Sequence, residues 1–261
     1  MQKLEKSYIS NFLKIGFAST AITLMSAYSA VAATLNITFQ KLEGLTGGNP
    51  AGTAVYYADL SNVDFDINSI TIGDSNRGGG TTGAFSGFDL DAIKLSRELV
   101  NNATSVNGIS GLSVFDFSSN GTALTPGTQR DPVNPGDPAK AVDMFGSTDG
   151  IVNNLVATLG SFDGNSTSAL QVDSANPSTA FGFVSLGDGG KISFNLTSAL
   201  SNSSNPLYLY IGEVGDNGEV VNGQIMVSDK PVPVPEPTSI AALSVLGIYI
   251  AVRRNQKKKI A

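Results

Sequence analysis

Short segments of β-forming residues, separated by turn residues, constrain the fold of this chain more than any other feature of its sequence. Six segments of four to six residues are rich in aromatic, aliphatic or β-branched side chains, which favour strands. They are residues 54–58, 69–72, 112–117, 180–184, 191–196 and 207–211. Because Gly, Asn, Asp or Pro bounds these segments, the chain turns often and leaves little room for long helices. The pattern predicts an all-β protein.

The same segments predict how the strands are arranged. Many short strands with Gly-rich turns are typical of two packed antiparallel sheets, so we expect a β-sandwich of jelly-roll type over residues 33–230. Asp216-Asn217-Gly218 lies between the strand-like stretches 208–214 and 219–227 and predicts a hairpin. Residues 92–100 fit either a short helix or a strand.

A proline-rich stretch interrupts the strand pattern near the middle of the chain. Residues 125–138 contain four prolines and two glycines and predict a long exposed loop within one domain. A boundary between two small domains at this loop is the alternative, but strand signals continue on both sides without a change in composition.

Three missing residue types exclude whole classes of chemistry. The chain contains no Cys, no His and no Trp. It therefore cannot form disulfides, thiolate zinc sites, histidine-ligated haem or a catalytic set that uses histidine as its base. Glu43, Glu98, Glu213 and Glu219 lie in no recognisable catalytic motif, and we expect a protein that is not an enzyme. A carboxylate-dependent glycan hydrolase, with an open groove between two carboxyl groups, is the alternative.

The first 32 residues have the organisation of a secretory signal. Three lysines precede an apolar stretch over 15–28, and Ala30-Val31-Ala32 matches the small-x-small rule for cleavage by signal peptidase. We expect the mature chain to begin at Ala33, after export across the inner membrane. An uncleaved N-terminal helix is the alternative, but the apolar stretch is short for a membrane span and a strand-like segment follows at once.

The C-terminal end has three parts in a definite order. Residues 230–237 form a proline-rich stretch, which is extended and has few backbone donors. Residues 238–252 carry no charge and predict a transmembrane helix about 22 Å long, a marginal span of a hydrocarbon core of about 30 Å. Arg253 and Arg254 begin a basic tail that we expect in the cytoplasm, which places the body of the protein outside.

The order of these parts resembles the PEP-CTERM sorting signal of secreted bacterial proteins. The match consists of Pro235-Glu236-Pro237, the apolar helix through Val252, and Arg253 with Arg254; it departs from the commonest form in having Thr238-Ser239 where that form has Ser-Thr. The resemblance implies that an exosortase in the membrane recognises and processes residues 231–261, with Pro235, Glu236 and Pro237 as recognition residues and not catalytic ones. A plain C-terminal anchor with a proline linker is the alternative.

The body between the two ends is strongly acidic. Residues 33–230 contain eight basic and 20 acidic side chains, a net charge of −12, which argues against a nucleic-acid partner. Two Asp-x-Asp pairs, Asp64 with Asp66 and Asp89 with Asp91, occur beside aliphatic strand-like stretches, and strand alternation places each pair on one face. Paired carboxylates can hold calcium, so calcium at these pairs is one prediction, and a solvent-facing strand edge is the alternative.

Two tyrosines suggest a second kind of binding site. Tyr208 and Tyr210 alternate with aliphatic residues and therefore share one face of a strand, where their rings could stack on a sugar. Packing of both rings inside one layer of the sandwich is the alternative.

These observations together predict an exported, non-enzymatic protein of the cell surface or of an exopolysaccharide matrix. We expect its C-terminal helix to hold it in the inner membrane only until an exosortase processes it, and we expect no cofactor apart from calcium. Extracellular polysaccharide is the expected partner in the matrix. A calcium- or carbohydrate-binding extracellular module is the alternative function.

Overall fold

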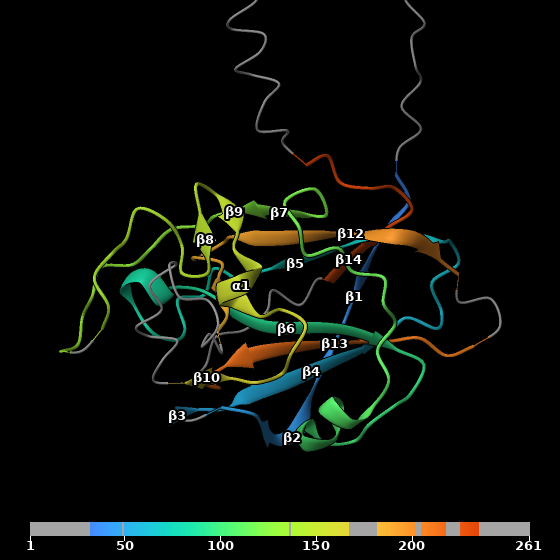
Figure 1. The fold of residues 1–261 in the computed structure, drawn as a ribbon, viewed down its shortest axis with the longest axis horizontal. Helices are drawn as coiled ribbons and strands as arrows, with labels where there is room; N and C mark the ends of the chain where they lie inside the picture. The colour runs from blue at the N-terminus through green and yellow to red at the C-terminus, as the bar shows by residue number, and fades with distance from the viewer. Residues whose placement is uncertain are drawn as a thin grey trace, which may run out of the picture. The chain divides into compact units, whose positions relative to one another are not determined.

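The computed structural model of the protein describes residues 32–48, 50–135, 137–166, 182–201, 205–217 and 225–234. Strands dominate these residues, and two five-stranded antiparallel sheets form the two main layers in Figure 1. The prediction of an all-β fold is confirmed. The predicted signal segment 1–31 and the predicted helix 238–252 lie outside the described residues.

Both sheets combine strands that are distant in the sequence. Sheet one has the order β1 (Thr34–Ile37), β14 (Ile225–Ser228), β5 (Ile67–Gly73), β12 (Lys191–Leu200) and β7 (Thr122–Thr125). Sheet two has the order β11 (Val184–Ser185), β6 (Asp89–Ser96), β13 (Tyr208–Val214), β4 (Thr53–Asp59) and β2 (Gln40–Thr46). Because the chain passes repeatedly from one sheet to the other, neither sheet can form without the other.

The remaining elements are short. Two-residue strands pair as β3 (Pro50–Ala51) with β10 (Asn165–Ser166) and as β8 (Ser147–Thr148) with β9 (Ile151–Val152). The helical elements among the described residues are α1 (Asn154–Ala157) and the 3-10 turns η1 (Gly83–Phe85) and η2 (Ala103–Gly108).

Side chains between the two sheets form the main core. Ile70 of β5 and Phe194 of β12 enter it from sheet one, and Ile93 of β6 and Ile211 of β13 enter it from sheet two. Burial of one such side chain contributes about 1.5–3 kcal/mol. Polar residues alternate with the hydrophobic core residues along much of β5 and β12, so the outer face of sheet one is polar, although Ser69, Thr71 and Ser193 on it are buried.

A second, smaller core covers the outer face of sheet two. Val55 of β4, Ala92 of β6 and Tyr210 of β13 pack there against Val106 of η2 and Phe162. The side chain of Asn102 begins η2 by accepting a hydrogen bond from the Ser105 N–H, as expected of an Asn N-cap. Sheet two is therefore buried on both faces.

Four of the six predicted strand segments are confirmed as parts of β4, β5, β12 and β13, and 92–100 contains the end of strand β6, not a helix. Of segment 180–184, only Val184 lies in a strand, and residues 180–181 lie outside the described part. The predicted loop 125–138 is confirmed as a loop, since the described residues from 126 to 146 contain no strand.

The predicted strand over 112–117 is wrong. Its first residue, Leu112, donates a hydrogen bond to the Leu95 carbonyl of sheet two, whereas Val114 accepts one from Thr197 of sheet one. The segment therefore crosses from one sheet to the other and cannot continue either ladder. Phe115 forms a single isolated antiparallel bridge with Leu196 of β12, and the rings of Phe115 and Phe117 pack nearly perpendicular to the ring of Phe194.

The predicted hairpin around Asp216-Asn217-Gly218 is also wrong. β13 belongs to sheet two and already has β6 and β4 on its two sides, so no edge is free for the next strand. β14 joins sheet one instead, between β1 and β5. The turn residues are thus part of a connection between sheets, of which 218–224 lie outside the described residues.

Candidate functional site

The first and last strands bring the two ends of the described chain together. β1 pairs antiparallel with β14, and Thr34 lies opposite Ser228. One residue further out, the Ala33 N–H donates to Oδ1 of Asp229 at 2.8 Å, and the Asp229 N–H donates to the Ala33 carbonyl at 3.1 Å. Figure 1 shows the blue start of β1 beside the red C-terminal segment. The points at which the predicted signal and the predicted sorting segment join the body are therefore neighbours.

Few of the residues predicted for processing fall in the described part. Ala32 and Ala33 precede β1, and Ala33 is exposed, whereas Ala30 lies outside. The sorting residues Pro235, Glu236, Pro237, Arg253 and Arg254 also lie outside, since the described chain ends at residue 234. Within the described ranges, no helix is long and apolar enough to cross a membrane.

Residues 229–234, which we call the spacer, are held on the outer face of sheet one. The Lys230 N–H donates to Ser228 Oγ at 3.2 Å, and the Lys230 carbonyl accepts from Ser69 Oγ at 2.8 Å. The Asn195 amide binds Val232 twice, because its Oδ1 accepts from the Val232 N–H at 2.7 Å and its Nδ2 donates to the Val232 carbonyl at 2.9 Å. The sequence pattern does not predict this site; the polar Ser69 and Asn195 on their strands are its only signal.

The two predicted aspartate pairs are not brought together. Asp64 and Asp66 are exposed and precede the first residue of β5. Asp74 follows the last residue of β5 and accepts a hydrogen bond from the Phe88 N–H, next to Asp89. The two pairs are thus separated by the length of a seven-residue strand, about 20 Å.

Asp89 and Asp91 are buried in β6, so the alternative of a solvent-facing strand edge is wrong for this pair. Ser185 Oγ donates to Asp89, and Asp91 Oδ2 accepts from Thr53 Oγ1 and from the Gly164 N–H. Asp91 is covered by the segment around Phe162 and Gly164, which packs on the outer face of sheet two, whereas Asp89 is buried beside Ser185 of β11. Among the described residues, no group of three or more acidic side chains is placed to hold a metal ion.

Burial also changes the acidity of these groups. It raises the pKa of Asp89, and it raises the pKa of Asp91, with a smaller contribution from Asp163 beside it. Glu213, at the end of β13, is fully buried, and burial followed by the nearby charge of Asp89 raises its pKa to about 9. The sequence analysis noted Glu213 but did not predict its burial, because a glutamate in a strand usually faces water.

The prediction of a tyrosine stacking surface is wrong for Tyr210. Its ring is fully buried in the second core, its hydroxyl donates to the Glu98 carbonyl at 2.8 Å, and the same hydroxyl accepts from the Val100 N–H at 3.1 Å. Segment 97–109 therefore covers the ring face that a sugar would need. Tyr208 is half-buried beside this cluster.

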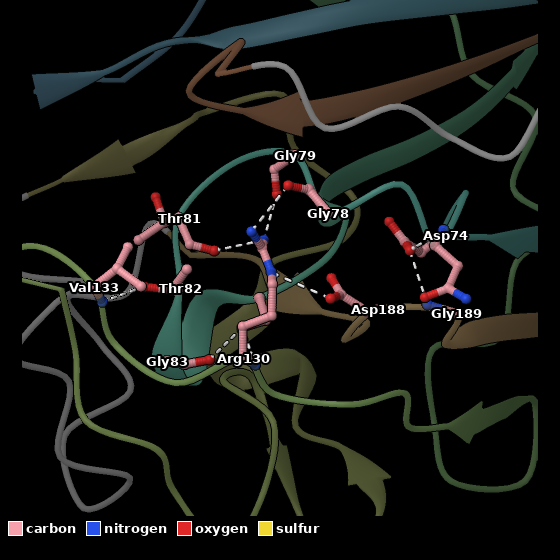
Figure 2. Close-up of polar contacts among 12 residues, drawn as sticks. Asp74, Gly78, Gly79, Thr81, Thr82, Gly83, Arg130, Val133, Asp188 and Gly189 are labelled. Atoms are coloured by element: carbon pink, nitrogen blue, oxygen red, sulfur yellow. Dashed lines mark hydrogen bonds and ion pairs between the residues drawn. The ribbon is translucent and has the colours of Figure 1, made fainter.

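A network around Arg130 fixes the loops at one end of the molecule. Figure 2 shows its guanidinium directed at the carbonyls of Gly78, Gly79 and Thr81, and its Nε lies 3.2 Å from Oδ2 of Asp188. These groups come from three separate loops, after β5, β7 and β11. The two terminal nitrogens donate to carbonyls, and Nε makes no hydrogen bond within the described residues but is buried in an ion pair with Asp188, so the network holds loops in place.

An open hollow of about 420 Å³ lies in the loop after β7. Its lining residues are Pro126, Gly127, Gln129, Lys140, Ala141, Val142, Asp143, Met144, Ser147 and Gly150. Asp143 is the one acidic side chain in this lining, whereas glycan hydrolysis uses two carboxyl groups across a cleft.

Comparison of the chain with protein families, with curated proteins and with solved structures finds no match.

Proposed function

We propose that this is an exported, non-enzymatic protein of the cell surface or exopolysaccharide matrix, sorted by processing at both of its ends. A signal peptidase removes residues 1–32, and an exosortase acts at Pro235-Glu236-Pro237 while the helix 238–252 lies in the inner membrane. The exported body then associates with extracellular polysaccharide.

The observation that carries this proposal is the pairing of the first and last strands. A chain held by one membrane through both ends needs a body whose two ends leave from the same side. The β1–β14 pair, closed by the two hydrogen bonds between Ala33 and Asp229, meets this requirement. Ala33 and Val234 both lie outside the strands, so cuts beyond them would remove neither sheet nor core.

We further propose that the body is a jelly roll. β7 and β2 lie at one edge of sheet one and sheet two, and without them each sheet has four strands. These eight strands, in chain order, are β1, β4, β5, β6, β11, β12, β13 and β14. Sheet one then contains the first, eighth, third and sixth strand, and sheet two the second, seventh, fourth and fifth. This interleaving of two Greek keys is the arrangement of double-sheet jelly rolls, a class that includes lectin and capsid domains. It supports a binding or structural role for the body.

The sorting step is tested by two variants expressed in the native host. Glu236→Ala alters the recognition motif, and deletion of residues 253–259 removes the basic tail. We expect both variants to accumulate as unprocessed chain in the membrane fraction, whereas Glu43→Ala, at an exposed position of β2, should be processed like the wild type. Normal release of both sorting variants would overturn the proposal.

A further inference from the structure

We propose that Ser228, Ser69 and Asn195 form a dock for the spacer, and that release of the spacer from this dock sets the rate at which the sorting motif is processed. The second part rests on the proposed function, whereas the dock itself does not.

The three side chains form one row across sheet one. Ser228 of β14 lies directly opposite Ser69 of β5, and Ser69 lies directly opposite Asn195 of β12. The spacer turns at Asp229 and crosses these strands, with a hydrogen bond to each: Lys230 binds Ser228 and Ser69, and Val232 binds Asn195. Three neighbouring strands of the sheet thus each contribute one residue of the row to binding the spacer. A chain end that touched the sheet by chance would not need polar residues at matching positions of all three strands.

The chemistry of the spacer matches this row. Pro231 and Pro233 have no backbone N–H, so Val232 has the first donor after Lys230. The Asn195 amide supplies one acceptor and one donor and therefore satisfies both backbone groups of Val232, as a neighbouring strand would. The register of β5 and β12 shifts directly after Asn195, where β12 departs from regular pairing. Asn195 thus stands at the last regular position before that shift.

The position of Val232 limits access to the motif. Pro235 is the third residue after Val232, a reach of about 10 Å when extended. A single helix of a membrane enzyme is about 10–12 Å across, so the docked spacer leaves too little chain for an enzyme to surround the motif. Release back to Ser228 lengthens the free chain to seven residues, about 24 Å. Processing therefore requires the undocked state.

Hydrogen exchange on the full-length chain in detergent micelles tests the dock. Within 231–234, only Val232 and Val234 have amide hydrogens, so a peptide covering these residues reports on the dock with little background. We expect Asn195→Ala to accelerate exchange at Val232 by about tenfold. Asn195→Asp, which keeps the acceptor but loses the donor, should give a smaller increase, and Asn101→Ala, at an exposed position, should give none. Unchanged exchange in Asn195→Ala and Asn195→Asp would overturn the dock.

Pulse–chase labelling in the native host tests the effect on processing. Exchange and processing both depend on the undocked fraction, so Asn195→Ala should shorten the lifetime of the membrane-bound precursor by the same factor of about ten. Faster exchange with unchanged or slower processing would overturn the rate control and leave the sorting proposal intact. A wild-type chain that is never processed would overturn the sorting proposal and the rate control together, while the exchange experiment would still decide the dock.

Discussion

Glu213 lies at the end of β13 with its side chain buried, and only one of its two carboxyl oxygens has a partner among the described residues. Its Oε2 accepts from the Asp216 N–H at 3.1 Å, whereas Oε1 has none. Burial therefore raises the pKa from 4.5 to about 9. Between these values the folded protein keeps a proton that the unfolded chain releases, so the free energy of unfolding falls as the pH rises from about 5 to 9.

Glu213→Gln removes this titration while keeping the shape of the side chain. We expect the variant to match the wild type near pH 4.5 and to be more stable at pH 8, because its unfolding no longer releases that proton. The slope of unfolding free energy against pH should become less negative by at most about 1.4 kcal/mol per pH unit. Denaturant unfolding of the exported protein between pH 5 and 8 measures this. Glu43→Gln, an exposed control, should keep the wild-type slope, and a wild-type slope in Glu213→Gln would contradict the account.

Tyr210 is a neutral polar side chain that is buried in the second core, where its hydroxyl has two hydrogen-bond partners. Tyr210→Phe removes the hydrogen bond to the Glu98 carbonyl and leaves the buried Val100 N–H without its acceptor. We expect a loss of about 1–2 kcal/mol in unfolding free energy. Tyr208→Phe, at the half-buried neighbouring position, should cost less. Equal stability of Tyr210→Phe and the wild type would show that the hydroxyl contacts do not hold segment 97–109 in place.

At the scale of elements, local patterns predicted most strands but not their partners. The alternation in 54–58, 69–72, 191–196 and 207–211 follows directly from strand geometry, and each segment is in a strand. The same reasoning failed at 112–117, where aromatic rings pack on one side while the chain crosses between sheets. It also failed at 216–218, because a turn signal does not reveal that β13 already has two neighbours.

The candidate site could be predicted only in part, for a related reason. The proposed terminal processing signals are continuous in the sequence, so they could be predicted there, and they stay predictions. Whether a face is covered depends on distant segments. Alternation therefore placed Asp91 and Tyr210 at the surface, although the segment around Phe162 and Gly164 covers Asp91 and segment 97–109 covers Tyr210. Asp89 is likewise buried, beside Ser185 of β11. The row that holds the spacer likewise depends on register between paired residues that are 126 (Ser69 and Asn195) and 159 (Ser69 and Ser228) positions apart in sequence.

Arg130 links three loops, and its removal should destabilise all of them. Arg130→Met keeps the aliphatic stem but loses the bonds to three carbonyls and leaves Asp188 without its ion pair. We expect a loss of about 2–3 kcal/mol and faster hydrogen exchange over residues 78–82. Lys140→Met breaks an exposed ion pair with Asp131, which solvent screens, and should cost much less. Similar losses in the two variants would contradict the role given to Arg130.

Across the whole molecule, the proposed removal of the signal would change the contact between the two ends. In the precursor, a neutral N–H of Ala33 donates to the Asp229 carboxylate. Cleavage before Ala33 would turn that group into an ammonium ion beside the same carboxylate. We expect Asp229→Asn to destabilise the processed protein by about 0.5–1 kcal/mol, the range for an exposed ion pair, and to affect the precursor less. Equal effects on both forms, compared by thermal unfolding, would contradict this ion pair.

We propose that both ends of this protein are processed, and intact mass measures this processing directly. The protein is recovered separately from the medium and from the membranes of its native host. We predict a released species that begins at Ala33 and ends close to Pro235–Pro237, or carries an added group there. A species that retains Arg253 to Ala261 and is found in the membrane alone would contradict the claim and leave a simple anchored protein.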